Sequence, residues 1–181
     1  MGVIFTALIQ YPEVLDFRKL VDDLKDVKMF PKTNEINEER NNLNTKMNTY
    51  VDTDMEEYLE LDFGKVDLTF NRSKVACIRI GCSWDYFLSD DETRLLIRGI
   101  CEEFVRYFKQ DRIIYLPDHY GLDYVYRENN IEQIITSLKK RLGDQPENIE
   151  SIYKEFEEYV EDDGYYIDTL ESLIEDNHNS I

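Results

Sequence analysis

The chain has 181 residues, 42% of them hydrophobic, and carries 39 Asp and Glu against 21 Lys and Arg, which gives a formal net charge of −18. This length fits one domain, with or without an appendage, and the hydrophobic fraction suffices for a core, so neither a second full domain nor global disorder is expected. The negative charge repels nucleic-acid phosphates and anionic lipid headgroups, so we expect neither nucleic acid nor a membrane as partner, whereas a basic protein surface fits.

The cysteines and the N-terminal residues indicate a cytoplasmic protein. Cys77, Cys82 and Cys101 make an odd count, and each lies in or beside an apolar run where a reduced thiol packs as a small hydrophobe. The apolar stretch that follows Met1 has no positive residues before it and is too short for a signal peptide or a membrane span.

The first half of the chain predicts a strand, a helix and a three-stranded meander. Residues 3–10 form an apolar run that suits a central strand buried on both faces. A helix is expected to open at Pro12, because apolar residues then recur at helical spacing. Residues 59–63, 66–70 and 75–80 follow a period of two between short turns, which predicts an antiparallel meander with one wet, partly acidic face.

Residues 32–49 separate these two parts and are strongly polar, with six asparagines. We expect this stretch to be an exposed connection or a short solvent-facing helix. Polar connections of this length often contribute to binding or act as lids, so the stretch is a second place to look for function.

The second half predicts two helices around a short strand. Ser89 and Glu92 have the spacing of a capping box that opens a long amphipathic helix. A strand ends at Pro117, and a further helix is expected to begin after Asn129 and to stop at Gly143. The predicted fold is therefore α+β, with a mixed, mostly antiparallel sheet of about five strands, helices packed on it, and the chain order βαβββαβαα.

The last 38 residues carry most of the negative charge. Residues 144–181 contain 13 Asp and Glu and a single basic residue, Lys154, so this segment holds −12 of the net −18. A helix is expected over about 146–162, with an apolar face that docks and an acidic face that does not. We therefore divide the chain into a core at 1–143, which includes the polar connection, and an acidic helical segment at 144–181 that docks on the core or extends from it.

Candidate catalytic and metal-binding residues all have a simpler structural interpretation. Asp118, His119 and Tyr120 follow a predicted strand, and an Asp could orient a His as a general base, but a structural turn fits the same residues better. The carboxylates at positions 85, 90 and 91 are explained by a helix N-terminus, and those at 60, 62 and 67 by a solvated strand face. The sequence contains no Gly-rich phosphate loop, no HExxH and no Gly-x-Ser-x-Gly, so we assign no cofactor and no metal.

The leading hypothesis is a non-enzymatic interaction protein that masks a basic protein surface, as bacterial immunity or inhibitor proteins do for nuclease-like toxins. In this mechanism the acidic side chains mimic phosphates and accelerate encounter, while tyrosines fill apolar gaps in the partner. The residues assigned to these roles are Glu157, Glu158, Glu161, Asp162, Asp163, Tyr165 and Tyr166. A solvated helix face with no partner explains the same acids equally well.

Two other classes of function remain open at the level of sequence. One is a small enzyme or ligand-binding protein with a site around Asp118, His119 and Tyr120 and the polar connection as a lid. The other is a structural subunit of a homo-oligomer, for which an exposed apolar patch at residues 84–87 would be the sign.

Overall fold

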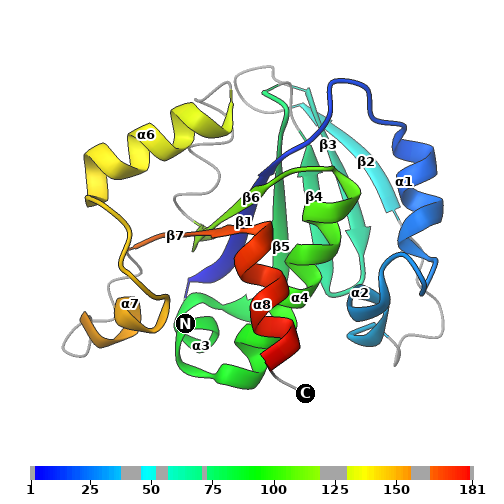
Figure 1. The fold of residues 1–181 in the computed structure, drawn as a ribbon. Helices are drawn as coiled ribbons and strands as arrows, with labels where there is room; N and C mark the ends of the chain where they lie inside the picture. The colour runs from blue at the N-terminus through cyan, green and yellow to red at the C-terminus, as the bar shows by residue number, and fades with distance from the viewer. Residues whose placement is uncertain are drawn as a thin grey trace.

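A seven-stranded sheet in the order β2-β3-β4-β5-β1-β6-β7 organises the fold. The structure is a computed structural model (Figure 1), and it describes residues 3–37, 46–51, 57–70, 73–118, 130–155 and 164–179. The strands are β1 (Ile4–Gln10), β2 (Lys46–Val51), β3 (Glu57–Phe63), β4 (Val66–Phe70), β5 (Val75–Ser83), β6 (Arg112–Pro117) and β7 (Tyr166–Thr169). The helices are α1 (Phe17–Leu24), α2 (Pro31–Glu35), α3 (Trp84–Ser89), α4 (Asp91–Tyr107), α6 (Ile131–Leu142), α7 (Glu150–Glu155) and α8 (Leu170–Asn179).

The α+β class is confirmed, with two corrections to the predicted sheet. Every neighbouring pair of described strands is antiparallel, so the sheet is not mixed. The sheet also has seven strands rather than about five. The additional strands are β2, which begins inside the predicted polar connection, and β7, which lies in the segment predicted to be helical.

The strand β1 lies inside the sheet, between β5 and β6, and is buried on both faces, as its apolar run predicts. On one face, Phe5, Ala7 and Ile9 join a large cluster with side chains from α1, α3, α4, α7 and α8. On the other face, Leu8 packs with residues of β5 and β6 and with the inner side of α6. Alternate residues of β1 therefore enter different cores, which explains why apolar residues occupy consecutive positions at Ala7, Leu8 and Ile9.

Helix starts differ from the sequence prediction by one to five residues. The helix expected at Pro12 begins at Phe17, because the Asp16 side chain accepts hydrogen bonds from Arg18 N and Lys19 N. The predicted capping box at Ser89 is wrong, since Ser89 ends α3 and the Asp90 carboxylate caps α4 by accepting from Thr93 N at 2.8 Å. A capping side chain needs an extended backbone, and Asp90 has one (φ −105°, ψ 112°).

Helix α6 lies close to its predicted position. Its N-cap is Asn130, one residue after the expected Asn129, and the Asn130 side chain accepts from Gln133 N. Its C-cap is Gly143, as predicted, with a φ of 87° that side-chain-bearing residues rarely adopt.

The C-terminal segment contributes both a strand and a helix to the core. Strand β7 pairs with β6 at the edge of the sheet, and α8 lies alongside α4 (Figure 1). The Asp168 carboxylate, 1% exposed, accepts from Arg98 Nε (2.7 Å) and Nη2 (2.8 Å) of α4. This bidentate ion pair fixes β7 and α8 onto the preceding part of the chain.

Among the described helices, none combines the length and the apolar character that crossing a bilayer requires.

Candidate protein-interaction surface

The junction between α3 and α4 is an acidic stretch of the chain. Residues 81–93 contain four carboxylates, Asp85, Asp90, Asp91 and Glu92, and no Lys or Arg. Asp91 and Glu92 lie in the first turn of α4 and are exposed, with 82% of the Asp91 side chain open to solvent. Carboxylates at this end of a helix interact favourably with the positive end of the helix dipole, so they stabilise the helix without an external partner.

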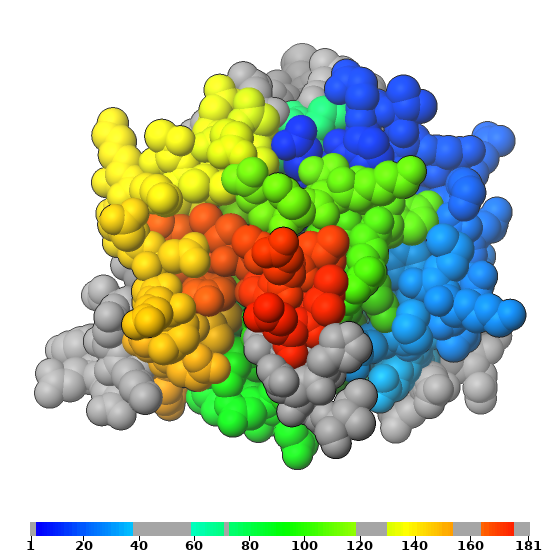
Figure 2. Space-filling view, viewed as in Figure 1, coloured from blue at the N-terminus to red at the C-terminus, as the bar shows by residue number. Residues whose placement is uncertain are grey.

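Helix α7 brings a second acidic stretch to the same region. Its apolar side docks as the sequence predicts, because Ile152 and Ile149, the residue before the helix, are 2% and 3% exposed and join the main core. The helix packs against α3, and the two lie side by side at the surface (Figure 2). Glu147 and Glu150 face solvent, and residues 144–153 contain no Lys or Arg.

The Arg94 guanidinium ties the two acidic stretches together. Arg94 is buried in α4, where Nη1 donates to the carbonyl oxygen of Leu88 at 2.7 Å. Its Nη2 pairs with the Asp91 carboxylate and, at 3.0 Å, with Glu150 Oε1 of α7. One buried cation thus holds two carboxylates that remain exposed on the outer side. We call the resulting surface the acidic patch, formed by Asp85, Asp90, Asp91, Glu92, Glu147 and Glu150.

Helices α3 and α7 each carry one exposed tyrosine. Tyr86 of α3 is 52% exposed and Tyr153 of α7 is 45% exposed. Rigid rings with a polar tip are common anchors in protein interfaces. The surface therefore combines clustered negative charge with aromatic groups.

The apolar patch considered for a homo-oligomer is largely internal. Trp84 and Phe87 are 2% and 0% exposed, and the Phe87 ring lies 4.4 Å from that of Phe5 between ring centroids. Of the aromatic residues at 84–87, only Tyr86 is exposed.

The residues that the sequence predicts for partner binding fall into two groups. Glu157, Glu158, Glu161, Asp162 and Asp163 lie outside the described residues. Tyr165 is 2% exposed, packs in the core under α6, and donates its hydroxyl to the Gly143 carbonyl at 2.7 Å. Tyr166 is half-buried on β7 and packs on the main core. In this structure Tyr165 fills a gap in its own protein rather than in a partner.

The acids of the α3–α4 junction were missed as binding residues because a helix N-terminus explains each of them singly. The signal that could have found them is the composition of residues 81–93, which contain four carboxylates and no Lys or Arg. Their proximity to α7 depends on tertiary packing through Arg94, which no local pattern encodes.

The alternative site at the end of β6 is described only at Asp118. Its Oδ1 accepts from Arg79 Nε at 3.0 Å and from Thr6 Oγ1 at 3.3 Å. Arg79 in turn lies opposite Asp67 across the β4–β5 pair. Burial, together with the charges of Asp62 and Glu60, raises the pKa of the Asp67 carboxyl. His119 and Tyr120 lie outside the described residues, so the structure does not place them relative to Asp118.

The carboxylates of the acidic patch do not form a metal site. Within the described ranges, no group of three or more His, Cys, Asp or Glu side chains is arranged to hold a metal ion. Asp90 is engaged as the cap of α4 and Asp91 in the ion pair with Arg94. The arrangement therefore suits a diffuse electrostatic surface rather than a coordination centre.

Comparison of the chain with models of known protein families, with curated proteins and with solved structures found no match.

Proposed function

We propose that this chain is a non-enzymatic protein that binds a basic protein surface through the acidic patch. The observation that carries the proposal is the Arg94 contact, which joins Asp91 of α4 to Glu150 of α7. Without it the two acidic helix starts would repel each other, so the fold uses a buried cation to keep them adjacent. The sequence continues from α7 into Glu157, Glu158 and residues 161–163, which add charge of the same sign.

The two kinds of side chain on the patch act at different stages of binding. Clustered carboxylates raise the association rate with a basic partner, and this effect weakens as salt screens the charges. Tyr86 and Tyr153 bury ring surface in the complex and slow its dissociation. More specifically, we propose that the partner is a basic toxin that cleaves nucleic acid and that this chain is its immunity or inhibitor protein. The carboxylates would then imitate the phosphates of the toxin's substrate.

The test compares variants that change the patch without touching the Arg94 contact. Glu92→Gln with Glu147→Gln removes two exposed charges, and Tyr86→Ser with Tyr153→Ser removes both rings. The matched control is Glu13→Gln with Asp22→Asn, which changes the net charge equally at exposed positions around α1. Proteins retained from a lysate of the source organism are identified, purified and then measured by biolayer interferometry against all four proteins.

We expect the captured protein to be basic and its affinity to fall about five- to tenfold for the charge variant, mostly through a slower association rate. The ring variant should dissociate faster, and the control should bind as the unmodified protein does. If the charge variant and the control bound equally well, the patch would not be the binding surface. If the captured partner is a nuclease, loss of its activity on adding this chain supports the inhibitor version, and unchanged activity contradicts it.

A further inference from the structure

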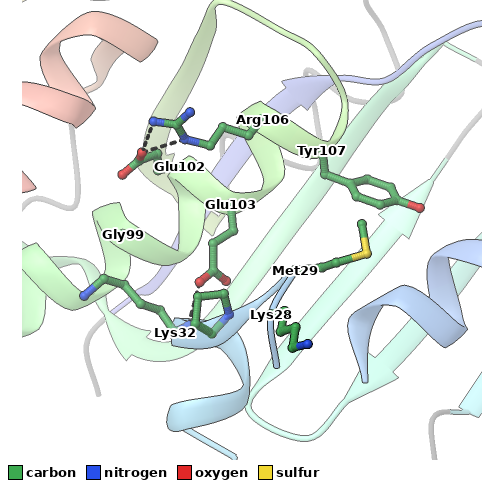
Figure 3. A pocket seen from close by; sticks show the side chains of 9 residues that line it. Lys28, Met29, Lys32, Gly99, Glu102, Glu103, Arg106 and Tyr107 are labelled. Carbon is green, nitrogen blue, oxygen red and sulfur yellow. Dashed lines mark hydrogen bonds and ion pairs between the residues drawn. The ribbon is translucent and has the colours of Figure 1, made fainter. Parts of the chain in front are cut away.

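A pocket of about 450 Å³ lies between α2 and α4, but its charged groups do not converge on a ligand. Figure 3 shows the head groups of Lys28, Lys32 and Arg106 on different sides of the pocket. Arg106 donates to the Glu102 carboxylate, and Glu103 accepts from the backbone N–H of Lys32. These groups therefore serve the protein's own structure, and a site for a second molecule has to be sought elsewhere.

The two edges of the sheet lie on opposite sides of the molecule, with β7 at one and β2 at the other (Figure 1). An edge strand has backbone N–H and C=O groups along its outer side that pair readily with a strand of another chain. The treatment of each edge therefore indicates where a second chain can add to the sheet.

Side chains block the edge at β7. Gln145 Oε1 accepts a hydrogen bond from Ile167 N at 3.1 Å, and Gln145 Nε2 donates to the carbonyl oxygen of Ile167 at 3.4 Å. The Gln145 amide thus makes the two bonds that a residue of a neighbouring antiparallel strand would make with Ile167. Two residues further on, Thr169 N donates to Ser172 Oγ at 3.0 Å. The protein itself occupies the outer side of β7.

Strand β2 is treated differently. In the part of the chain that the structure describes, no strand pairs with its outer side. It pairs with β3 along its whole length of six residues without a bulge. Its sequence, KMNTYV, has no proline, glycine or carboxylate, and its single charged residue, Lys46, stands at the first position. Prolines, bulges and charges within the strand are the usual protection of an edge, so β2 is the edge at which a strand can be added.

A second copy of β2 fits this edge in geometry. A twofold axis perpendicular to the sheet joins two identical edges antiparallel, as every neighbouring pair of strands in this sheet already is. With the axis at Thr49, Met47 of one copy lies opposite Val51 of the other, and Asn48 lies opposite Tyr50. Odd-numbered residues thus pair with odd-numbered ones, which continues each side of the sheet across the axis.

A second copy also fits in charge. Each chain carries −18, yet β2 has no carboxylate, so the two copies meet along strands that contribute no negative charge. In the register centred on Thr49 no like charges face each other, and the Met47–Val51 pairs are apolar. Glu60 and Asp62 lie one strand further in, on β3. Their repulsion across the axis is weakened by distance and by salt.

We propose that the chain forms a homodimer in which two β2 strands pair antiparallel about a twofold axis at Thr49, joining the two sheets into one. The contact is short, so the dimer is weak, with a dissociation constant on the order of 100 μM. Helix α7, which carries part of the acidic patch, lies on the other side of the molecule (Figure 1). The dimer therefore leaves both acidic patches accessible, and it does not depend on the function proposed for them.

Sedimentation equilibrium of the full chain measures the association. We expect the average mass to rise from that of a monomer at about 10 μM towards that of a dimer at about 500 μM. Because both copies are negative, raising KCl from about 20 to 500 mM should tighten the dimer about threefold or more. Salt acts in the opposite direction on a complex with a basic partner, so the two contacts can be told apart. A chain that stays monomeric at high concentration and high salt would overturn the proposal.

Two variants locate the contact. Asn48→Lys with Tyr50→Lys places lysines opposite lysines across the axis, which should weaken the dimer about tenfold or more. The matched control, Gln133→Lys with Thr136→Lys, makes the same change of charge at exposed positions of α6 and should associate at least as well as the unmodified chain. Circular dichroism verifies that both variants are folded. Equal association of the two variants would show that the dimer does not use β2.

A spin label reads the same contact without blocking it. In the dimer, labels on Thr49→Cys meet at the axis within about 2 nm and broaden the electron paramagnetic resonance spectrum. Labels on Thr136→Cys should show no broadening, because α6 packs over β1, β5 and β6, away from β2. The unmodified chain gives the background from its native cysteines. A dimer in sedimentation without broadening at Thr49 would place the contact elsewhere and overturn the proposal.

Discussion

Individual ion pairs decide how much of the formal charge reaches the surface. The C-terminal segment carries −12 in the sequence, but Asp168 is 1% exposed and is neutralised by Arg98, with Ser172 Oγ donating to its Oδ1 at 3.0 Å. Glu150 differs, because its partner Arg94 is buried while 47% of its own side chain remains exposed. An acidic residue count therefore overstates the charge available to a partner, and burial of each pair identifies which charges remain.

The three cysteines lead to a prediction at the same scale. Burial, reinforced by the charges of Asp85 and Asp90, raises the pKa of the Cys82 thiol to about 11, and burial raises that of Cys77 to about 12. Cys101 is buried and its pKa is raised as well. Because the thiolate is the reactive form, a raised pKa slows alkylation at neutral pH.

We expect iodoacetamide at about pH 8 to modify Cys82 roughly two orders of magnitude more slowly than a cysteine in the unfolded chain. The rate should rise about tenfold per pH unit up to the region of its pKa, while Cys77 and Cys101 should react only when urea unfolds the protein. Mass spectrometry of peptides reads each site separately, and the urea-unfolded chain is the control. Rapid labelling of Cys82 in the folded protein would contradict the assigned environment.

At the scale of elements, the start of α4 gives a direct comparison between sequence and structure. Asp90 caps the helix, and hydrogen bonds from Thr93 lower the pKa of its carboxyl. Ser89, which the capping-box pattern selects, is exposed and ends α3. Asp90→Ala should therefore lower the free energy of unfolding by about 1 kcal/mol, and Ser89→Ala by less than about 0.5 kcal/mol.

Urea denaturation of both variants measures this difference. The sign of the pH dependence provides a check, because a carboxyl with a lowered pKa in the folded state stabilises above its unfolded pKa and loses this effect as the pH falls. The gap between the unmodified protein and Asp90→Ala should thus narrow in acid. A larger loss of unfolding free energy for Ser89→Ala than for Asp90→Ala would show that Ser89, and not Asp90, is the N-cap residue of α4.

The elements that the sequence predicts correctly are those with a strong period. Strands β1, β3, β4 and β5 and helices α4 and α6 have clear apolar spacing, and all appear near their expected positions. Strand β2 has the sequence KMNTYV and follows an asparagine-rich stretch. Its polar residues lack the apolar alternation that predicts a strand, so this edge strand is not expected from the sequence. Strand β7 has four residues, and its buried position is an aspartate, which only the distant Arg98 makes tolerable. The acidic patch depends on the same kind of long-range contact, that of Arg94 with Glu150.

At the scale of the whole molecule, the C-terminal segment is part of the domain. Removing residues 144–181 would delete β7, α8 and the buried side chains of Ile149, Tyr165, Asp168 and Leu173. It would also leave Arg98 without its carboxylate partner inside the protein, a change that commonly costs several kcal/mol. Deletion would thus test folding rather than binding, whereas point substitutions at exposed positions change the surface and leave the core in place.

The net charge of −18 makes salt act in opposite directions on folding and on binding. Screening relieves repulsion among the protein's own carboxylates, so raising KCl from about 20 to 500 mM should increase Tm by about 2–4 °C, which corresponds to about 1 kcal/mol. The same change should weaken the complex with a basic partner, because attraction across the interface is screened. Calorimetry and interferometry on one preparation measure both quantities.

The variant Glu92→Gln with Glu147→Gln separates the two effects. It should retain the increase of Tm with salt, since its net charge remains strongly negative, but its affinity should depend less on salt than that of the unmodified protein. A Tm that falls with added salt would mean that attractive pairs such as Arg94–Glu150 and Arg79–Asp118 outweigh repulsion. In that case ion pairs within the chain would neutralise the exposed carboxylates, and the acidic patch would not attract a basic surface.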